Sequence, residues 1–202
     1  MRIAAAELRP LSRTGVAAIL LFLAAARPAV GQETPLVAGD ARAFVTAEIA
    51  TTRLAGEWTP QAGGRLELHL SSRILVGGAA RIGLTSPTFE RVGSSVRLHF
   101  GYAGVAIGVL PEPVRWPGLR LGALLGGGNA DAMDPALGTL LDSDNGIVVE
   151  PSAAYALRLH GRASMAASAA WRYAAGFSLL GGVRSRDLRG FSAAFGITLG
   201  PF

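Results

Sequence analysis

The sequence predicts an all-β protein, an eight-stranded antiparallel up-and-down transmembrane β-barrel, and three observations predict this fold class. Apolar and polar residues alternate with period two along several segments, which is typical of strands with two unlike faces. The composition is 50% hydrophobic and only 16% charged, with a mean hydropathy of +0.37, which is more apolar than an ordinary soluble domain. The connections between the segments alternate between short and long, as in barrels with turns at one end and loops at the other.

The first residues carry the features of a cleaved export signal. Arg2, Arg9 and Arg13 form a basic region, an apolar run of 12 residues follows over 15–26, and small residues at 29–31 offer a cleavage position. An uncleaved anchor is the alternative, but a helix needs about 20 apolar residues to cross a bilayer. We therefore expect residues 1–31 to be a signal peptide and residues 32–202 to form an outer-membrane barrel domain.

Composition excludes several classes of function. The chain has no cysteine, so it has no disulfide, thiolate metal site or cysteine nucleophile. The expected leader holds four arginines and one glutamate, and its removal lowers the formal charge from +5 to +2, which is no footprint for nucleic acid. Beyond the leader no window is apolar enough for a spanning helix, so a mature chain in a membrane must cross it as strands.

The first half of the barrel is expected to hold four strands. These are 42–51 (RAFVTAEIAT), 63–71, 73–85 (RILVGGAARIGLT) and 95–110 (SVRLHFGYAGVAIGVL), each alternating or apolar. Only two serines separate the second strand from the third, whereas the connections at 52–62 and 86–94 are longer and contain glycine or proline.

The second half repeats this arrangement. Its expected strands are 117–128, 147–159, 162–175 and 188–200. Two prolines in the connection 111–116 end the strand ladder there, and His160 lies in a tight turn before the seventh strand. The connections 129–146 and 176–187 are long, so we expect short turns on the periplasmic side and longer loops on the exterior side.

The charges in these segments gather on one face. In 147–159 the even positions carry Glu150 and Arg158, and the odd positions carry no charge. In a transmembrane barrel the apolar series faces lipid, whereas a water-soluble barrel reverses this arrangement. Small residues between the charges suit a cramped interior, so we expect the transmembrane arrangement. The expected lipid-facing residues are Leu66, Leu68, Leu70, Tyr155, Leu157, Trp171 and Tyr173.

Two aromatic residues strengthen this assignment of faces. Trp171 and Tyr173 lie near a strand end on the apolar face, where they fit the aromatic belt of a membrane interface. Ordinary core packing of these rings is the alternative.

The segments IVVEPSAAYALRL, ASAAWRYAAG and GFSAAFGITLGPF together resemble small bacterial outer-membrane β-barrel proteins. The resemblance is to the Bacteroidota-like members of the OmpA/OmpX type, whose penultimate hairpin has V-x-E-P-G followed by S-Y-R-Y-x-S-G. The matching residues are Val149, Glu150, Pro151, Trp171, Arg172, Tyr173, Gly176 and the terminal Phe202, and Ser152 departs from the pattern. The resemblance implies export, insertion by the outer-membrane barrel assembly machinery with Phe202 as a recognition element, and no enzymatic role.

A charged pair is expected inside the barrel. If the hairpin at 160–161 pairs residues whose numbers sum to 322, Glu150 and Arg172 face each other and both point inward. A charge inside a narrow barrel must be paired, because an unpaired charge costs several kcal/mol there. We therefore expect an interior salt-bridge plug of Glu150 and Arg172, with Glu67, Arg97 and Arg158 as further members. A gate or ion path is the alternative.

Two exterior connections carry charge of one sign. The connection 129–146 contains Asp131, Asp134, Asp142 and Asp144, which predicts a solvated acidic loop; divalent-cation binding by Asp142, Asp144 and Asn145 is the alternative. The last connection carries Arg184, Arg186 and Arg189, which predict a solvated basic loop or, alternatively, a grip on lipid phosphates.

No motif for catalysis, cofactor binding or metal binding stands out, although His69 and His99 have inward parity. We expect a monomeric outer-membrane protein that is no enzyme and has no cofactor. Its role is expected to be structural or mediated by loops, and outer-membrane lipid and the assembly machinery are its expected partners. The alternatives are a soluble periplasmic or secreted barrel that binds a small apolar ligand, or an outer-membrane lipid-modifying enzyme.

Overall fold

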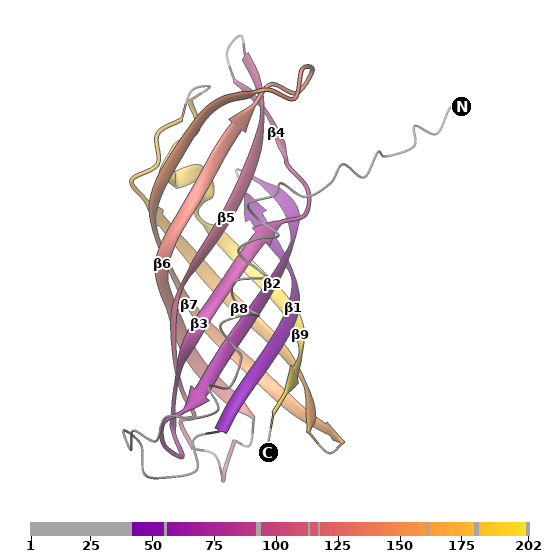
Figure 1. The fold of residues 1–202 in the computed structure, drawn as a ribbon, viewed down its shortest axis with the longest axis vertical. Coiled ribbons are helices and arrows are strands. Elements are labelled where there is room, and N and C mark those ends of the chain that lie inside the picture. The colour runs from indigo at the N-terminus through magenta and orange to yellow at the C-terminus, as the bar shows by residue number, and fades with distance from the viewer. Residues whose placement is uncertain are drawn as a thin grey trace, which may run out of the picture. The chain divides into compact units, whose positions relative to one another are not determined.

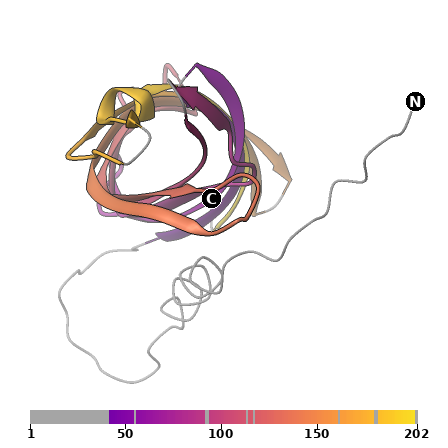
Figure 2. The same cartoon turned by 90° about the horizontal axis from the view of Figure 1, so that it is seen from above.

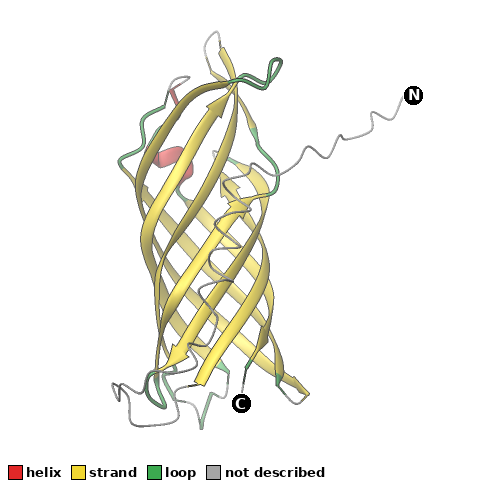
Figure 3. Cartoon of the chain, viewed as in Figure 1, coloured by secondary structure: helices red, strands yellow, loops and turns green. Residues whose placement is uncertain are grey.

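The computed structural model describes residues 42–200 apart from residues 55, 92–93, 113, 117, 161 and 180–181. The expected signal peptide and Phe202 lie outside the described residues. The described part is mostly β-strand, and the last connection includes the short 3-10 helix η2 (Ser185–Leu188) (Figure 3). No helix within it combines the length and apolar character that a bilayer span requires.

The strands follow one another as an antiparallel meander (Figure 1). Each strand pairs with the next in sequence, except that β3 and β4 both pair with β5, and the first strand also pairs with the last. Their bounds are β1 (Arg42–Leu54), β2 (Glu57–His69), β3 (Ile74–Gly83), β4 (Thr88–Arg91), β5 (Ser94–Val109), β6 (Leu119–Met133), β7 (Leu140–His160), β8 (Ala163–Ala175) and β9 (Gly190–Leu199).

The sheet closes into a barrel of eight strands. Strands β3 and β4 both pair with β5, one after the other, so together they form a single interrupted strand. The pairings of β3 with β5 and of β1 with β9 leave no open edge in the ring, which Figure 2 shows from above. The expected eight-stranded up-and-down barrel is therefore confirmed.

The strands extend further toward the loop end than the sequence predicted. β1 continues to Leu54 and β2 begins at Glu57, so most of the expected loop 52–62 is paired strand. β7 begins at Leu140, inside the expected loop 129–146, and β4 lies inside the expected loop 86–94. Polar residues in these stretches still pair as strands, because the ladder satisfies the backbone amides whatever the side chains contact.

The barrel interior changes character along its axis. Small polar and charged residues predominate toward the turn end, where Thr46, Glu67 and Ser164 are buried, although Phe44 and Leu75 are buried there too. Apolar residues fill the loop end, where one buried cluster gathers Leu54, Val96, Leu98, Phe100 and Val148 with residues of the β8–β9 connection. The loop end is thus packed like the core of a water-soluble barrel, and the turn end is not.

Candidate functional site

A buried arginine, Arg81, lies at the centre of the barrel interior. Its Nε donates a hydrogen bond to Glu48 Oε1 at 2.7 Å, and its Nη1 donates to Glu150 Oε1 at 2.6 Å. Nη1 also lies 3.3 Å from Ser192 Oγ and 3.4 Å from the Tyr102 hydroxyl, which itself donates to Glu150 Oε2. Side chains from β1, β3, β5, β7 and β9 thus meet in one cluster, which we call the central cluster.

The central cluster keeps three charges out of water. Arg81 is 4% exposed, Glu48 is 8% exposed and Glu150 is 2% exposed. An uncompensated charge at this depth costs several kcal/mol, and the planar guanidinium offsets this by donating to both carboxylates at once. Arg172 adds a second positive charge nearby, because its guanidinium carbon lies 5.5 Å from the centre of the Tyr102 ring.

A second ion-pair cluster lies closer to the turn end. The carboxylate of Glu67, which is 1% exposed, pairs with Arg65 at 3.3 Å and also with Arg120. Gly118 allows the chain to enter β6 at this point, because its φ is +104° and a Cβ there would lie 2.2 Å from the carbonyl oxygen of Ala156. Arg120 is thereby brought into the lumen two residues later.

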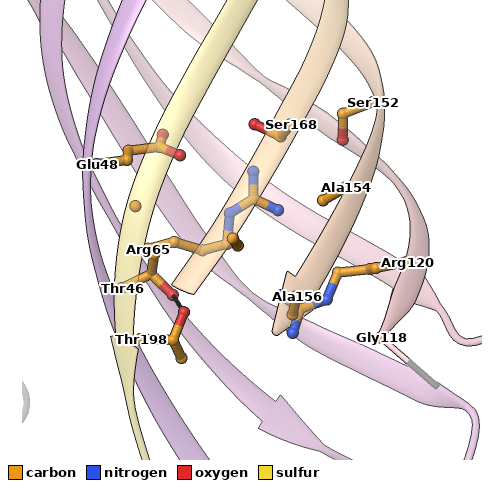
Figure 4. A pocket seen from close by; sticks show the side chains of 12 residues that line it. Thr46, Glu48, Arg65, Gly118, Arg120, Ser152, Ala154, Ala156, Ser168 and Thr198 are labelled. Atoms are coloured by element: carbon orange, nitrogen blue, oxygen red, sulfur yellow. Dashed lines mark hydrogen bonds between the residues drawn. The ribbon is translucent and has the colours of Figure 1, made fainter. Parts of the chain in front are cut away.

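A small polar cavity adjoins this second cluster (Figure 4). Its volume of about 40 Å³ holds a few water molecules but no organic ligand, since one water needs about 10–15 Å³ on this measure. The hydroxyls of Thr46 and Thr198 hydrogen-bond across β1 and β9 at 2.8 Å in its wall. The other polar side chains that line it are Glu48, Arg65, Arg120, Ser152 and Ser168.

The expected partners Glu150 and Arg172 are both buried, but their contacts differ from the expectation. The β7–β8 register has the sum of 322, as in the pairs Val149–Tyr173 and Ser152–Ala170. Among the described residues, the carboxylate of Glu150 pairs with Arg81, and Arg172 is over the Phe100 ring at 4.9 Å. Arg172 Nε donates to the carbonyl oxygen of Leu188 at 2.7 Å, so the arginine binds the last connection instead.

The other three expected members of the interior network have different places. Glu67 is buried and paired, but in the second cluster. Arg158 is exposed at the turn end of β7, eight residues from Glu150 and therefore about 26 Å away along the strand. Arg97 lies on the outward face of β5, where its Nη2 donates to the carbonyl oxygen of Pro135 at 3.4 Å, so its expected place in the lumen is wrong.

The reason for the Arg97 error is the change of interior along the axis. The inward residues of β5 are the even ones, Val96, Leu98, Phe100 and Tyr102, because the loop end has an apolar core. His99 shares the outward face with Arg97, so its expected inward parity is also wrong. Charged residues indicate the inward face only where the outward face is apolar. At the loop end the interior is apolar, so charged residues there lie on the outward face.

The β8–β9 connection closes the loop end of the barrel. Phe177, Leu179, Val183 and Leu188 are each 5% exposed or less and pack into the apolar interior. The rings of Phe100 and Phe177 meet edge to face at 5.9 Å between centroids. The sequence suggested only an exterior basic loop here, and its apolar residues carried the missed signal. We call these four side chains the cap.

The outward face is apolar over most of the barrel. Leu68, Leu70, Tyr155 and Leu157 are between 42% and 55% exposed, as are Trp171 and Tyr173 on β8, and Leu66 is partly exposed. All seven expected lipid-facing residues therefore point away from the lumen. This orientation counts against the alternative in which they line a ligand pocket.

The acidic connection 129–146 forms strand ends and a turn. Asp134 Oδ1 accepts the backbone amides of Ala136 and Leu137 at 2.7 and 2.8 Å, which shapes the turn. Asp144 Oδ2 accepts the backbone amide of Ser178 at 2.7 Å, so it holds the connection that carries the cap. Within the described residues no three His, Asp or Glu side chains gather as metal ligands would.

His99 lies beside a serine hydroxyl and opposite an aspartate. Ser86 Oγ lies 3.0 Å from both ring nitrogens of His99, and Asp131 is the cross-strand neighbour of that histidine. The hydroxyl of Ser143 donates a hydrogen bond to Asp131 Oδ1 at 2.6 Å, and no hydrogen bond joins Asp131 to His99 among the described residues. A nucleophile needs a base that a third group orients, and that orienting contact is not among those of the described residues.

The comparisons with known proteins give a likeness of fold. No protein-family model and no curated protein matches the chain. The structure of Ail, the attachment invasion locus protein of Yersinia pestis, in complex with the heparin analogue sucrose octasulfate, is similar with a TM-score of 0.51 and 11% identity. The match covers 80% of this chain and 99% of Ail.

Two further solved structures are similar at lower scores. Neisserial surface protein A has a TM-score of 0.48 and 11% identity over 80% of this chain and 97% of its own. The N-terminal β-barrel domain of Pseudomonas aeruginosa OprF has a TM-score of 0.43 and 14% identity over 78% and 96%. The resemblance to small outer-membrane barrels is confirmed at the level of fold through Ail, and a Bacteroidota-like origin stays a prediction.

Sequence reasoning missed the residues that make most interior contacts: Glu48, Arg65, Arg81, Tyr102 and Arg120. A usable signal existed for Arg81, which is a charge inside an otherwise apolar, glycine-rich strand and has the same parity as Leu75 and Ala79. Requiring a partner for every charge in mid-strand would have paired it with Glu48 or Glu150.

Proposed function

We propose that the chain is an integral outer-membrane β-barrel protein with a structural role or a role in interactions through its loops. The single observation that carries the proposal is the outward apolar face. Each of the eight long strands exposes large apolar side chains, among them Ile49, Ile74, Val105, Leu125 and Phe195. A continuous belt of this kind is unstable against water and matches the hydrocarbon core of a bilayer.

We further propose that the lumen is closed and does not conduct. Three layers support this: the second cluster with its small cavity, the central cluster around Arg81, and the cap at the loop end. An eight-stranded barrel encloses a space that side chains just about fill. The charged residues of the lumen therefore act as a plug, rather than as a gate or ion path.

Location and partners follow from the same proposal. The basic and apolar leader at 1–31 directs export, and Phe202 addresses the chain to the barrel assembly machinery. Outer-membrane lipid surrounds the belt, and a single chain completes the ring as a monomer, because the β1–β9 and β3–β5 pairings close it. The likeness of fold to an attachment protein supports interaction through the loop end rather than enzymatic activity.

Membrane fractionation and a heat-modifiability gel test the proposal. The full precursor is expressed, outer membranes are isolated and extracted in mild detergent, and gel mobility is compared with and without boiling. We expect a folded species in the outer-membrane fraction that changes mobility on boiling. Recovery of the protein in the soluble periplasmic fraction would overturn the proposal and revive the soluble ligand-binding barrel.

A charged substitution on the outward apolar face further distinguishes an outer-membrane barrel from a soluble one. Ile49 is 68% exposed in the middle of β1, and Ile49→Arg places a charge in the expected lipid. Such a charge costs about 2–4 kcal/mol at the bilayer midplane, so we expect less inserted protein, whereas Ile49→Leu inserts normally. In a water-soluble barrel, an exposed arginine at this position changes little.

A further inference from the structure

Two exposed arginines lie next to each other at the loop end of the outward face. Arg53 is the last outward residue of β1, and the register that pairs Thr52 with Ser192 places it opposite Phe191 of β9. Arg189 precedes β9 in extended backbone, with φ −80° and ψ 144°, on the same face as Phe191. Arg53 and Arg189 are therefore diagonal neighbours on adjacent strands, with their Cα atoms about 7–8 Å apart.

Aromatic side chains flank this pair. Trp58 is the cross-strand partner of Arg53, and its ring meets that of Phe191 edge to face at 6.5 Å. Trp171 pairs with Phe191 on the other side and has Tyr173 at 6.3 Å between ring centroids. Such a belt marks the boundary between acyl chains and head groups, so the arginines lie at head-group depth.

The backbone orients both guanidinium groups. Arg53 Nε donates to the carbonyl oxygen of Gly56 at 3.3 Å, and Arg189 Nε donates to that of Ala174 at 3.1 Å. Within the described residues, no acceptor is recorded for the Nη groups of either arginine. These donors form the planar fork that binds phosphate oxygens in pairs.

The charge of the rim differs from one side of the barrel to the other. Arg184 and Arg186 are exposed in the connection that leads to Arg189. Arg186 lies 3.9 Å from Asp187, so the segment 184–189 carries three arginines against one acid and extends the positive region. On β6 and β7 the outward residues at the same end are instead polar or acidic: Asn129, Asp131, Ser143 and Asn145. Glu57, near Arg53, belongs to the inward series of β2. The positive side therefore selects an anion.

We propose that this basic rim, Arg53 and Arg189 beside the aromatic residues, binds the phosphate groups of a phosphorylated glycolipid in the membrane leaflet at the loop end. The inference rests on the proposed function, because it requires the belt to lie in a bilayer. Aromatic rings next to guanidinium groups match a molecule that has acyl chains and a phosphorylated sugar head group.

A lipid-binding titration tests the proposal with the folded full-length mature protein in neutral detergent micelles. The probes are diphosphorylated lipid A and the same lipid with its phosphates removed, and binding is followed by tryptophan fluorescence. The variant R53Q/R189Q is compared with R115Q, whose arginine lies at the turn end with its side chain 73% exposed. We expect R53Q/R189Q to bind roughly tenfold or more weakly and R115Q to bind like the wild type.

Three results would overturn the proposal: equal binding of the two lipids, equal binding by R53Q/R189Q, or full competition by inorganic phosphate, which would indicate a site for a soluble anion. R53K/R189K keeps the charge but removes the fork, so weakened binding by this variant supports the geometry if R53Q/R189Q does not fold. Heat-modifiability of each variant in outer membranes keeps the two proposals apart. A chain that inserts normally but binds both lipids equally contradicts only this inference. A chain that is absent from the membrane contradicts the proposed function.

Discussion

Arg81→Met removes the positive charge that the central cluster needs while keeping an unbranched apolar side chain. The carboxylates of Glu48 and Glu150 then lose ion pairs of 2.7 and 2.6 Å and remain buried. Breaking a buried pair in this way costs about 3–5 kcal/mol, because it leaves an uncompensated charge. We expect the free energy of unfolding to fall by about this amount.

Urea unfolding of the protein in lipid vesicles, followed by tryptophan fluorescence, measures this change. Arg115→Met is the matched control, because its ion pair with Glu112 at 3.9 Å is solvent-exposed and worth less than about 1 kcal/mol. The variant that combines Arg81→Met with Glu48→Gln and Glu150→Gln removes the stranded charges, and it should recover much of the loss. A loss below about 1 kcal/mol for Arg81→Met, or no recovery in the combined variant, would refute the central cluster as a unit.

Three further predictions concern packing. Gly126→Ala should destabilise the barrel by about 1–3 kcal/mol, because its Cβ would lie 2.0 Å from the carbonyl oxygen of Ala103, whereas Gly127→Ala, with no contact nearer than 3.8 Å, should have little effect on urea unfolding. Gln61→Leu should leave stability unchanged or raise it, because the buried amide has no hydrogen-bond partner among the described residues; a clear loss in the same assay contradicts this. Phe177→Ala should cost about 3–5 kcal/mol, and if single-channel recording also detects new conductance, the cap and not the central cluster is the main barrier.

The fold was accessible to sequence reasoning because its evidence is local. Period-two alternation and connection length can each be seen within one hairpin, so the expected strand 162–175 matches the observed Ala163–Ala175 almost residue for residue. Strand ends at the loop side were less accessible, because a polar stretch such as 140–146 has the composition of a loop and the hydrogen bonds of a strand.

The interior contacts were less accessible because they cross the lumen. Arg81 and Glu48 lie on strands that are not neighbours in the sheet, and so do Arg81 and Glu150. Hairpin arithmetic predicts partners only between adjacent strands, and it correctly set Glu150 opposite Arg172 in register. It could not show that a third strand offers Glu150 a better donor, since that depends on barrel diameter and side-chain reach.

The cap lies in the connection between the last two strands. The β8–β9 hairpin therefore completes the ring of strands and also blocks the loop end of the lumen. While β9 is unpaired, the remaining strands form an open sheet whose apolar upper interior, around Phe100 and Val148, has nothing to cover it. Docking of β9 on β1 brings Leu188 and its neighbours over that surface in the same motion. Closure of the ring by β9 and exclusion of water from the upper lumen are therefore coupled, and a truncated chain that lacks this hairpin would leave the apolar surface around Phe100 and Val148 uncovered.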